Sequence, residues 1–477
     1  MSKLPSQREN FPAWYNEVVR LADLAENSSS PGSYILKPYG YAIWERVQSL
    51  LNQEIKKTGT ENAYFPLLIP EAFINREKEH VEGFSPELAV VTHGGGKELT
   101  EKLVARPTSE TIIYDTFSKW INSYRDLPLK INQWANVVRW EMRPRAFLRT
   151  REFLWQEGHT AHQTDKEAAE FVHLILKMYE KFDREILSIP VVIGQKSESE
   201  KFAGAKYTLT TEALARDGKA IQAGTSHHLG TNFASSFDIS FLGQDEQKHL
   251  VHQTSWGLSS RIVGTVIMVH GDDRGLKLPP RIAPYQAVVI PIFNKNTDQS
   301  FKDFLEKVIK SLGQTKYDQE DLRFKVDDRE GKSPGFKFNE WEVKGAPIRI
   351  EVGPRDAENN SVVIARRDTG EKIIAQLEDI PQLISELLAE IQKNLLSEAE
   401  RNLEENTREA KNMEEFREIM KKQGGFIKSF WCENSECEEK IIKGTKATIR
   451  CIPLERKEGA CLQCGNRGVE TYFAKAY

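Results

Sequence analysis

The sequence predicts a large α+β domain, in which helices flank an antiparallel sheet, followed by a small α/β domain and a small α+β domain. Between residues 86 and 269 the expected strands and helices do not repeat as βαβ units. After Pro280 strands and helices alternate regularly, and all five cysteines lie within the last 46 residues. A chain of 477 residues exceeds one hydrophobic core, so several compact domains are expected.

The composition is that of a soluble globular protein, with 39% hydrophobic and 29% charged residues. The first ten residues lack the apolar segment of a signal peptide, and apolar runs such as 262–269 are shorter than the ~20 residues that span a bilayer. We therefore expect a cytoplasmic protein with no membrane segment. The formal net charge of -4 gives no overall positive field, so any nucleic-acid contact needs local basic patches.

The N-terminal part predicts helices over 11–26 and 38–57, the second with apolar residues at helical spacing. A short strand is expected over 63–70, but its two prolines confine it to an edge, a strand end or a subunit boundary. The rest of this domain is expected to contain a hairpin at 86–105, a helix at 111–120, strands at 130–141 and 149–162, a helix at 166–187, and strand-rich stretches at 190–210 and 220–243, which lead to 251–269 with an apolar helix at 262–269.

The second domain is predicted from the alternation of strands and helices along the chain, which places helices on both faces of its sheet. Its expected elements are strands at 286–292, 322–326, 348–352 and 362–365, and helices at 299–312, 337–343 and from about 380. More than half of residues 397–422 are charged, which predicts a solvated linker helix.

Five arginines lie between Arg139 and Arg151, around a loop that joins two predicted strands. Guanidinium groups bind phosphate oxygens in pairs and stack on purine rings, so this strand pair is suited to a nucleoside triphosphate. Composition alone leaves open whether the segment is a nucleotide site or only a basic surface hairpin.

Arg139-Trp-Glu141 together with the stretch 147–159 resembles motif 2 of class II aminoacyl-tRNA synthetases, in its prolyl version. Pro66 resembles the motif 1 proline at the dimer interface, and Ser255-Trp-Gly-Leu-Ser-Ser-Arg261 resembles motif 3. Residues 106–110 and 224–230 resemble the family's amino-acid-side loops. Five short motifs in order make coincidence improbable. The resemblance implies a class II catalytic domain at 1–280 (motif 1 near 40–70, motif 2 near 135–162, motif 3 near 251–271), an anticodon-binding domain at 281–396, and a zinc-binding domain with its linker helix at 397–477.

The resemblance assigns the reaction to two catalytic arginines, Arg139 on the α-phosphate and the proline carboxylate and Arg261 on the adenine and γ-phosphate. It implies an ATP site with Mg²⁺ nearby, made of Arg139, Glu141, Arg149, Thr150, Gln222, Thr225, Ser259 and Arg261. Preorganised cations stabilise the charge that develops at phosphorus, so no covalent enzyme intermediate is expected.

The implied proline site consists of Thr108, Glu110, Arg139, Trp155, Glu157, His159, Phe202 and His227. A secondary ammonium needs an acidic acceptor and its ring an aromatic wall, which Glu110, Trp155 and Phe202 supply. Without the resemblance, the two histidines would be interpreted as structural residues of a sheet.

Two features limit which amino acid the enzyme can use as its substrate, independently of the motifs. Threonyl-type relatives use an active-site zinc with a cysteine ligand, and no cysteine precedes residue 432. Only about ninety residues separate motifs 2 and 3, whereas bacterial-type prolyl enzymes carry a large editing domain there. We therefore expect the archaeal and eukaryotic-like type without the inserted domain.

In the second domain, the resemblance implies that charged side chains recognise the unstacked bases of the anticodon loop, because such side chains can form hydrogen bonds with the edges of guanine. These are Glu340, Lys344, Arg349, Glu351 and Arg355, each of which is otherwise an ordinary solvated residue. Cys432-x4-Cys437 and Cys461-x2-Cys464 have the spacing of a structural four-thiolate zinc site, with Cys451 as an alternative ligand. The final Tyr477 resembles a family tyrosine that lies near the active site.

The sequence thus predicts a homodimeric ligase that activates L-proline with ATP and transfers it to tRNA(Pro). One alternative is a synthetase for threonine or glycine. The other is a synthetase-like protein without catalysis that serves as a tRNA-binding module.

Overall fold

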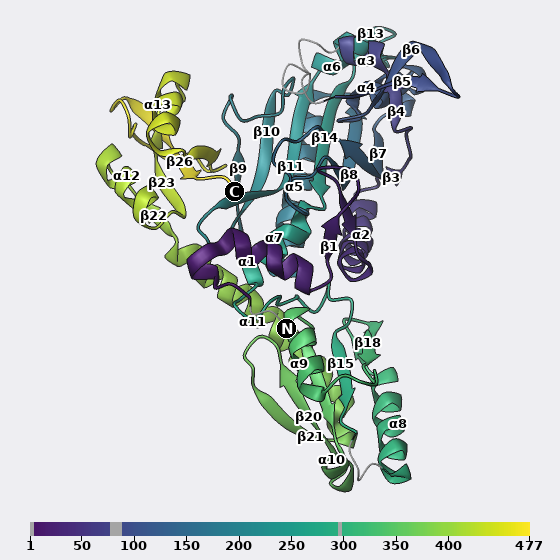
Figure 1. Cartoon of the computed structure of the whole chain (residues 1–477). Coiled ribbons are helices and arrows are strands. Elements are labelled where there is room, and N and C mark those ends of the chain that lie inside the picture. Colours follow the sequence, from purple (N-terminus) through teal and green to yellow (C-terminus); the bar gives the residue numbers. More distant parts are fainter. Residues whose placement is uncertain (1–3, 77–87, 294–297) are drawn as a thin grey trace.

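The computed structural model describes residues 4–76, 88–293 and 298–477. Three parts are visible in Figure 1: a sheet-rich part that holds the first half of the chain, an α/β part at the opposite end, and a smaller C-terminal part beside the large sheet. Among the described residues, no helix has both the length and the apolarity needed to cross a membrane.

A seven-stranded sheet in the order β3-β7-β8-β14-β11-β10-β9 forms the centre of the first part. All neighbours are antiparallel except β3 and β7, which confirms the predicted antiparallel sheet. Its strands are β3 (Glu61–Asn62), β7 (Leu129–Val138), β8 (Glu152–His162), β14 (His252–Ser259), β11 (Ala220–Gly230), β10 (Tyr207–Leu214) and β9 (Val191–Gln195).

Helices bury one face of this sheet. The largest core cluster joins apolar residues of α1 (Gln7–Leu21), α2 (Pro38–Lys57), α5 (Asp165–Glu185) and α7 (Arg261–His270) to strand residues such as Trp256 and Leu258. The first helix begins before the expected residue 11 and ends before the expected residue 26, because Asp23 has a φ of 55° and the chain then enters β1 (Ala25–Asn27), which pairs with β2 (Tyr34–Leu36).

A second layer lies beyond the end of the sheet, where α4 (Glu110–Trp120) and α6 (Asn232–Phe237) share an apolar cluster. The expected hairpin is present as β5 (Ala89–Gly94) and β6 (Lys97–Ala105), although residues 86 and 87 lie outside the described part. Only Leu68–Pro70 of the expected strand 63–70 is extended in a ladder, as β4. The short helix α6 was not predicted. The remaining short elements are α3 (Glu71–Arg76), η2 (Tyr124–Asp126), β12 (Ser240–Leu242) and β13 (Lys248–Leu250).

The second part is a five-stranded sheet in the order β18-β15-β19-β20-β21 with helices on both faces, as predicted. One face packs against α8 and α11, and the other packs around Trp341 of α9. The bounds are β15 (Ala287–Pro291), α8 (Gln299–Gly313), β16 (Lys316–Tyr317), β17 (Glu320–Asp321), β18 (Phe324–Val326), α9 (Pro334–Val343), β19 (Ile348–Val352), α10 (Pro354–Glu358), β20 (Ser361–Arg366), β21 (Lys372–Gln376), η3 (Leu377–Asp379) and α11 (Ile380–Glu405).

The predicted charged linker helix over 397–422 is wrong. Helix α11 ends at Glu405, and the chain forms β22 (Thr407–Glu409) before α12 (Met413–Lys422), which Asn412 caps. Phe416 and Met420 of α12 are buried in the core of the C-terminal part, so this helix has one apolar face among its many charged residues. The other elements are β23 (Phe426–Trp431), α13 (Ser435–Thr445), β24 (Thr448–Cys451), β25 (Glu458–Ala460) and β26 (Arg467–Ala474).

Candidate active site

A cavity of about 250 Å³ lies on the sheet face opposite α5, over β8, β14, β11 and β10. Strand register gathers its polar residues into rows across the sheet. His159, Ser255, His227 and Thr208 are direct neighbours in one row, and Glu157, Gly257, Thr225 and Thr210 form the next. Trp155 and Ser259 begin the third row. The cavity is therefore built by alternate residues of four strands.

One end of the cavity is a closely hydrogen-bonded acidic cluster. Glu157 accepts hydrogen bonds from Ser109 and from Gln133 Nε2 at 2.8 Å, and its other oxygen lies 3.1 Å from His159 Nε2. The His159 Nδ1 atom lies 3.2 Å from the Tyr114 hydroxyl. Glu157 and His159 are each only 1% exposed, so their geometry is fixed by the fold.

The pKa values of the two carboxyl groups at this end are shifted in opposite directions. Burial alone would raise the pKa of Glu157, but the hydrogen bond and charge of His159, with Ser109 and Gln133, hold that pKa below its usual value. Burial raises the pKa of Glu110, and the negative charge of Glu157 adds to this rise. Thr108 donates a hydrogen bond to Glu110. A buried carboxyl with one hydroxyl partner offers an acceptor for a bound cation.

The aromatic wall of the same end comes from Phe202 and His227, whose ring centroids are 4.8 Å apart. The Thr208 hydroxyl lies 2.8 Å from His227 Nδ1 and accepts a hydrogen bond from the backbone N–H of Phe202. Burial lowers the pKa of His227 to about 3, so its ring is neutral and apolar enough to face an aliphatic ring.

The other end of the cavity carries the two arginines. The Arg139 guanidinium lies 5.3 Å from the centre of the Phe153 ring and 5.7 Å from that of Trp155, and its Nε donates to the Pro107 carbonyl at 3.0 Å. Arg261 begins α7, and its Nε donates to the Leu148 carbonyl at 3.2 Å. Backbone carbonyls thus orient both guanidinium groups, and both arginines line the cavity.

Most of the predicted site residues line this single cavity. It brings together Thr108, Glu110, Arg139, Trp155, Glu157, His159, Phe202, Gln222, Thr225, His227, Ser259 and Arg261. Three predicted ATP residues do not line it. Thr150 lies in a neighbouring cavity of about 280 Å³, while Glu141 and Arg149 form an ion pair at 3.8 Å.

Sequence reasoning missed several residues of the site. Phe153 lines both cavities and lies two residues before Trp155 on the same strand face, so strand alternation could have identified it. Gln133 supports Glu157 from outside β8, and no sequence signal connects it to Glu157; Ser109, which also supports Glu157, lies within the motif at 106–110 but was given no role of its own. Tyr477, which the resemblance places near the active site, lies at the arginine end: Arg261 is 6.0 Å from the centre of its ring, and its hydroxyl donates to the Leu148 carbonyl.

Three family models match the chain. The class II core domain of the G, H, P, S and T tRNA synthetases matches residues 91–270, an anticodon binding domain matches 286–387, and the prolyl-tRNA synthetase C-terminal domain matches 413–477. The proline–tRNA ligases of Natranaerobius thermophilus and Oceanobacillus iheyensis are 48% and 50% identical to this chain, over all of it and 98% of each relative.

The chain belongs to the prolyl-tRNA synthetases. It is a class II aminoacyl-tRNA ligase, so the predicted family, fold class and enzymatic activity are confirmed. A crystal structure of prolyl-tRNA synthetase from Cryptosporidium parvum complexed with halofuginone and AMPPNP has a TM-score of 0.94 and 42% identity, over 99% of both chains. A second, complexed with L-proline and AMP, has a TM-score of 0.92 and 40% identity, over 100% of this chain and 99% of the other.

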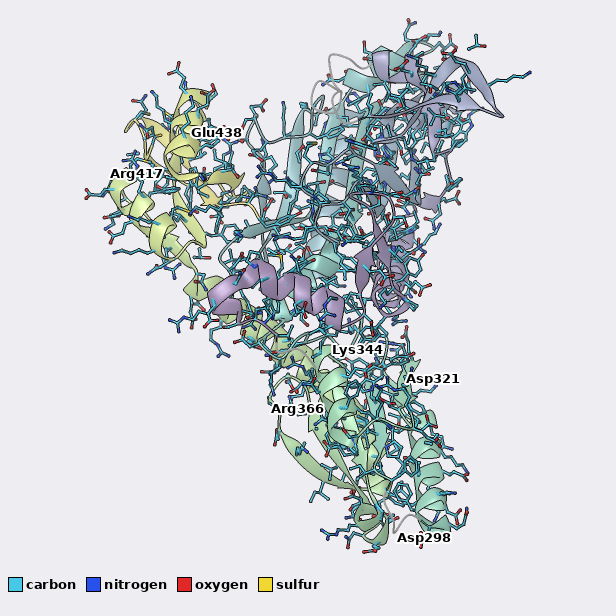
Figure 2. All side chains as sticks on the ribbon, in the orientation of Figure 1. Asp298, Asp321, Lys344, Arg366, Arg417 and Glu438 are labelled. Atoms are coloured by element: carbon cyan, nitrogen blue, oxygen red, sulfur yellow. The ribbon has the colours of Figure 1, made fainter. Side chains whose placement is uncertain are left out.

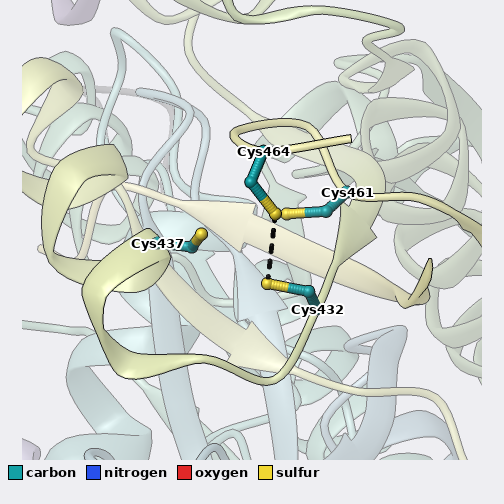
Figure 3. Close-up of side chains that lie close together, drawn as sticks. All are labelled: Cys432, Cys437, Cys461 and Cys464. Carbon is teal, nitrogen blue, oxygen red and sulfur yellow. Dashed lines mark hydrogen bonds between the residues drawn. The ribbon is translucent and has the colours of Figure 1, made fainter. Parts of the chain in front are cut away.

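The C-terminal part of this synthetase holds four cysteines together, as Figure 3 shows. The sulfur atoms of Cys432, Cys437, Cys461 and Cys464 all lie within 4.8 Å of one another, and those of Cys432 and Cys464 are 3.6 Å apart. Sulfur ligands on a tetrahedral Zn²⁺ are separated by about 3.8 Å, so the four thiols fit that ion. Cys451 is buried in β24 and lies outside this group.

The five predicted anticodon residues do not form one cluster. Glu340 and Lys344 are buried, and Lys344 bonds Glu340 at 3.1 Å and Asp23 of the first part at 2.9 Å (Figure 2). Arg349 donates to Glu351 at 2.9 Å on β19, while Arg355 is exposed on α10. Their part in base recognition stays a prediction.

Proposed function

We propose that this cavity binds proline and ATP side by side and joins them as prolyl-adenylate, which then transfers proline to tRNA(Pro). The observation that carries the proposal is the cavity itself, where a buried acidic and aromatic end adjoins an end with two oriented arginines. The Cryptosporidium parvum relative binds L-proline and AMP, and AMPPNP in a second structure, which supports the same occupants here.

In the first step the proline carboxylate attacks the α-phosphorus, an oxygen–phosphorus bond forms, and the bond to pyrophosphate breaks. Arg139 lines the cavity beside Trp155, so its guanidinium group can bind both the carboxylate and the α-phosphate. Arg261 is assigned to the adenine and γ-phosphate, with Gln222, Thr225 and Ser259 along the ribose and phosphates. These groups stabilise developing charge, and no protein nucleophile is required.

The proline ring is assigned to the wall of Trp155, Phe202 and His227, and its ammonium to Glu110 and Thr108. Glu157 and His159 support this end through the hydrogen bonds described above. In the second step the terminal hydroxyl of tRNA attacks the carbonyl of the adenylate and AMP leaves.

Thr150 lies outside the cavity, so in this proposal Phe153, which lines both this cavity and the neighbouring one, faces the purine instead. Glu141 and Arg149 would close over the nucleotide from the motif 2 loop. Mg²⁺ would arrive with the triphosphate, since phosphate oxygens and water supply most of its ligands.

We propose several further properties. The four clustered cysteines hold a structural Zn²⁺, since four thiolates leave no open position for catalysis. The protein is a homodimer through the segment of Pro66, where Tyr64, Leu68 and Trp120 are 73%, 42% and 49% exposed. The chain divides into domains at 1–280, 281–396 and 397–477, and the middle domain reads the anticodon. The protein supplies prolyl-tRNA for translation in the cytoplasm.

Proline-dependent exchange of pyrophosphate into ATP tests the proposal. The purified protein should exchange with proline far faster than with threonine or glycine. Exchange with no amino acid would favour the alternative of a tRNA-binding module without catalysis. Loss of proline exchange in Phe202→Ala and Trp155→Ala, with folding retained, would place proline at the assigned wall.

A further inference from the structure

The segment 196–202 between β9 and β10 is part of the cavity and is also bonded to the C-terminal part of the chain. Its residues Glu200, Lys201 and Phe202 line the cavity. No secondary structure holds this segment, apart from a turn in which the Ser197 carbonyl accepts from the N–H groups of Glu200 and Lys201, at 3.1 and 2.9 Å. The position of Phe202 therefore depends on what holds this turn, together with the hydrogen bond from its own N–H to the Thr208 hydroxyl.

Glu438 of α13 holds the turn from the other side. A single oxygen, Oε1, accepts hydrogen bonds from the Ser197 hydroxyl at 2.9 Å and the Ser199 hydroxyl at 2.7 Å. The Glu438 side chain is 3% exposed, so water does not compete for these bonds. Figure 2 labels Glu438 on the C-terminal part, at the side that faces the large sheet.

A second contact fixes the start of the segment. Lys196 bonds Glu212 of β10 at 2.6 Å, and the other Glu212 oxygen accepts from Nη2 and Nε of Arg450 in β24, at 2.8 and 3.0 Å. All three groups are buried. Burial alone would raise the pKa of Glu212, but the charges of Lys196 and Arg450 outweigh it and lower that pKa.

The backbones also meet at this point. Gln195 and Ile452 exchange both backbone hydrogen bonds at 2.8 Å. Gly194 permits this approach, because a Cβ atom there would lie 2.2 Å from the Ile452 carbonyl oxygen. Three independent contacts therefore converge on the few residues that precede Phe202.

We propose that the C-terminal part positions the proline-binding wall, and that Glu438 is the positioning residue that holds the turn carrying Phe202. The inference rests on the proposed proline site. Glu438 touches neither substrate, so its loss acts through Phe202 on proline and leaves the arginine end, and hence ATP, unaffected.

The test is pyrophosphate exchange by the full-length protein, with KM measured separately for proline and ATP. In Glu438→Ala the KM for proline should rise about tenfold, the equivalent of a buried hydrogen bond, while the KM for ATP stays within about twofold. Glu438→Gln, which keeps one acceptor oxygen, should recover most of the loss. Glu439→Ala, on the same helix but exposed, is the matched control. Calorimetric titration with proline alone should give the same ranking.

Ser197→Ala/Ser199→Ala removes the two donors without touching α13, and serves if Glu438→Ala fails to fold. An unchanged KM for proline in the folded serine variant overturns the inference, as does an equal rise of both KM values. Phe202→Ala separates the two proposals. If it raises the KM for proline and the Glu438 and serine variants do not, only the positioning role fails; if it has no effect, the assigned proline wall fails.

Discussion

Replacing Arg139 by alanine should cost the enzyme most of its activation step and little of its stability. The side chain is only partly buried; it lies against the rings of Phe153 and Trp155 and donates a hydrogen bond to the Pro107 carbonyl. Loss of such cation–π contacts costs about 1–2 kcal/mol of unfolding free energy. Loss of a preorganised donor at a developing negative charge costs about 2.7–4 kcal/mol, or roughly 10²–10³ in rate.

The two costs can be separated with three variants. Arg139→Ala should lower kcat/KM for proline-dependent pyrophosphate exchange by about 10²–10³. Arg139→Lys keeps the charge but loses the planar fork, so it should recover only about tenfold of that loss. Arg125→Ala removes an exposed arginine that also stacks on an aromatic ring, Tyr124, outside the cavity, and should leave exchange unchanged. If Arg139→Ala retains more than about a tenth of the parent activity, the assigned role of Arg139 is refuted.

Three other outcomes follow from the structure. Because burial raises the pKa of Glu110, the KM for proline should rise on acidification at a higher pH than an ordinary carboxyl would give, and Glu110→Gln should abolish this dependence. Cys437→Ser should lower bound zinc from about one ion per chain and lower the Tm, whereas Cys451→Ala should keep the ion; equal zinc in both would exclude the proposed ligands. Burial raises the pKa of Asp183 to about 8. The folded protein thus keeps a proton that the unfolded chain loses above about pH 4, so this group's contribution to stability falls by about 1.4 kcal/mol per pH unit up to pH 8. Asp183→Asn should flatten that slope in urea unfolding curves.

Much of the cavity could be predicted from the motifs that resemble those of the synthetase family, and strand periodicity explains why these residues meet on one face. Trp155, Glu157 and His159 alternate along β8, which places them on one face once the strand is recognised. The four clustered cysteines were predicted for a similar reason, since ligand spacing is local in sequence. Gln133 and Ser109 could not be found this way, because their contact with Glu157 depends on the pairing of β7 with β8 and on the approach of the chain to α4.

The charged stretch in the C-terminal part shows a second reason why prediction from the sequence failed. Charged residues dominate 397–422, so the apolar pair Phe416 and Met420, spaced four apart, was not recognised as a buried face. The breaks around β22 also have local causes, since Asn412 caps α12 through bonds of 3.0 Å to the N–H groups of Glu414 and Glu415. The burial of Lys344 depends on Asp23, more than three hundred residues away, and no local pattern reveals such a contact.

The central strand β14 explains why the sheet has a cavity at all. Its residues on the cavity face, Ser255, Gly257 and Ser259, are all small, whereas β8 and β11 on either side carry the large polar and aromatic groups. The opposite face of β14 carries Trp256 and Leu258 in the core, where Trp256 packs against α5. Room for that indole comes from Gly158, at which a Cβ atom would lie 2.1 Å from the ring. The alternation of small and large residues along β14 therefore leaves room for substrates on one face of the sheet and packs the core on the other. A shift of the strand by one residue would place the large residues in the cavity and the small ones in the core.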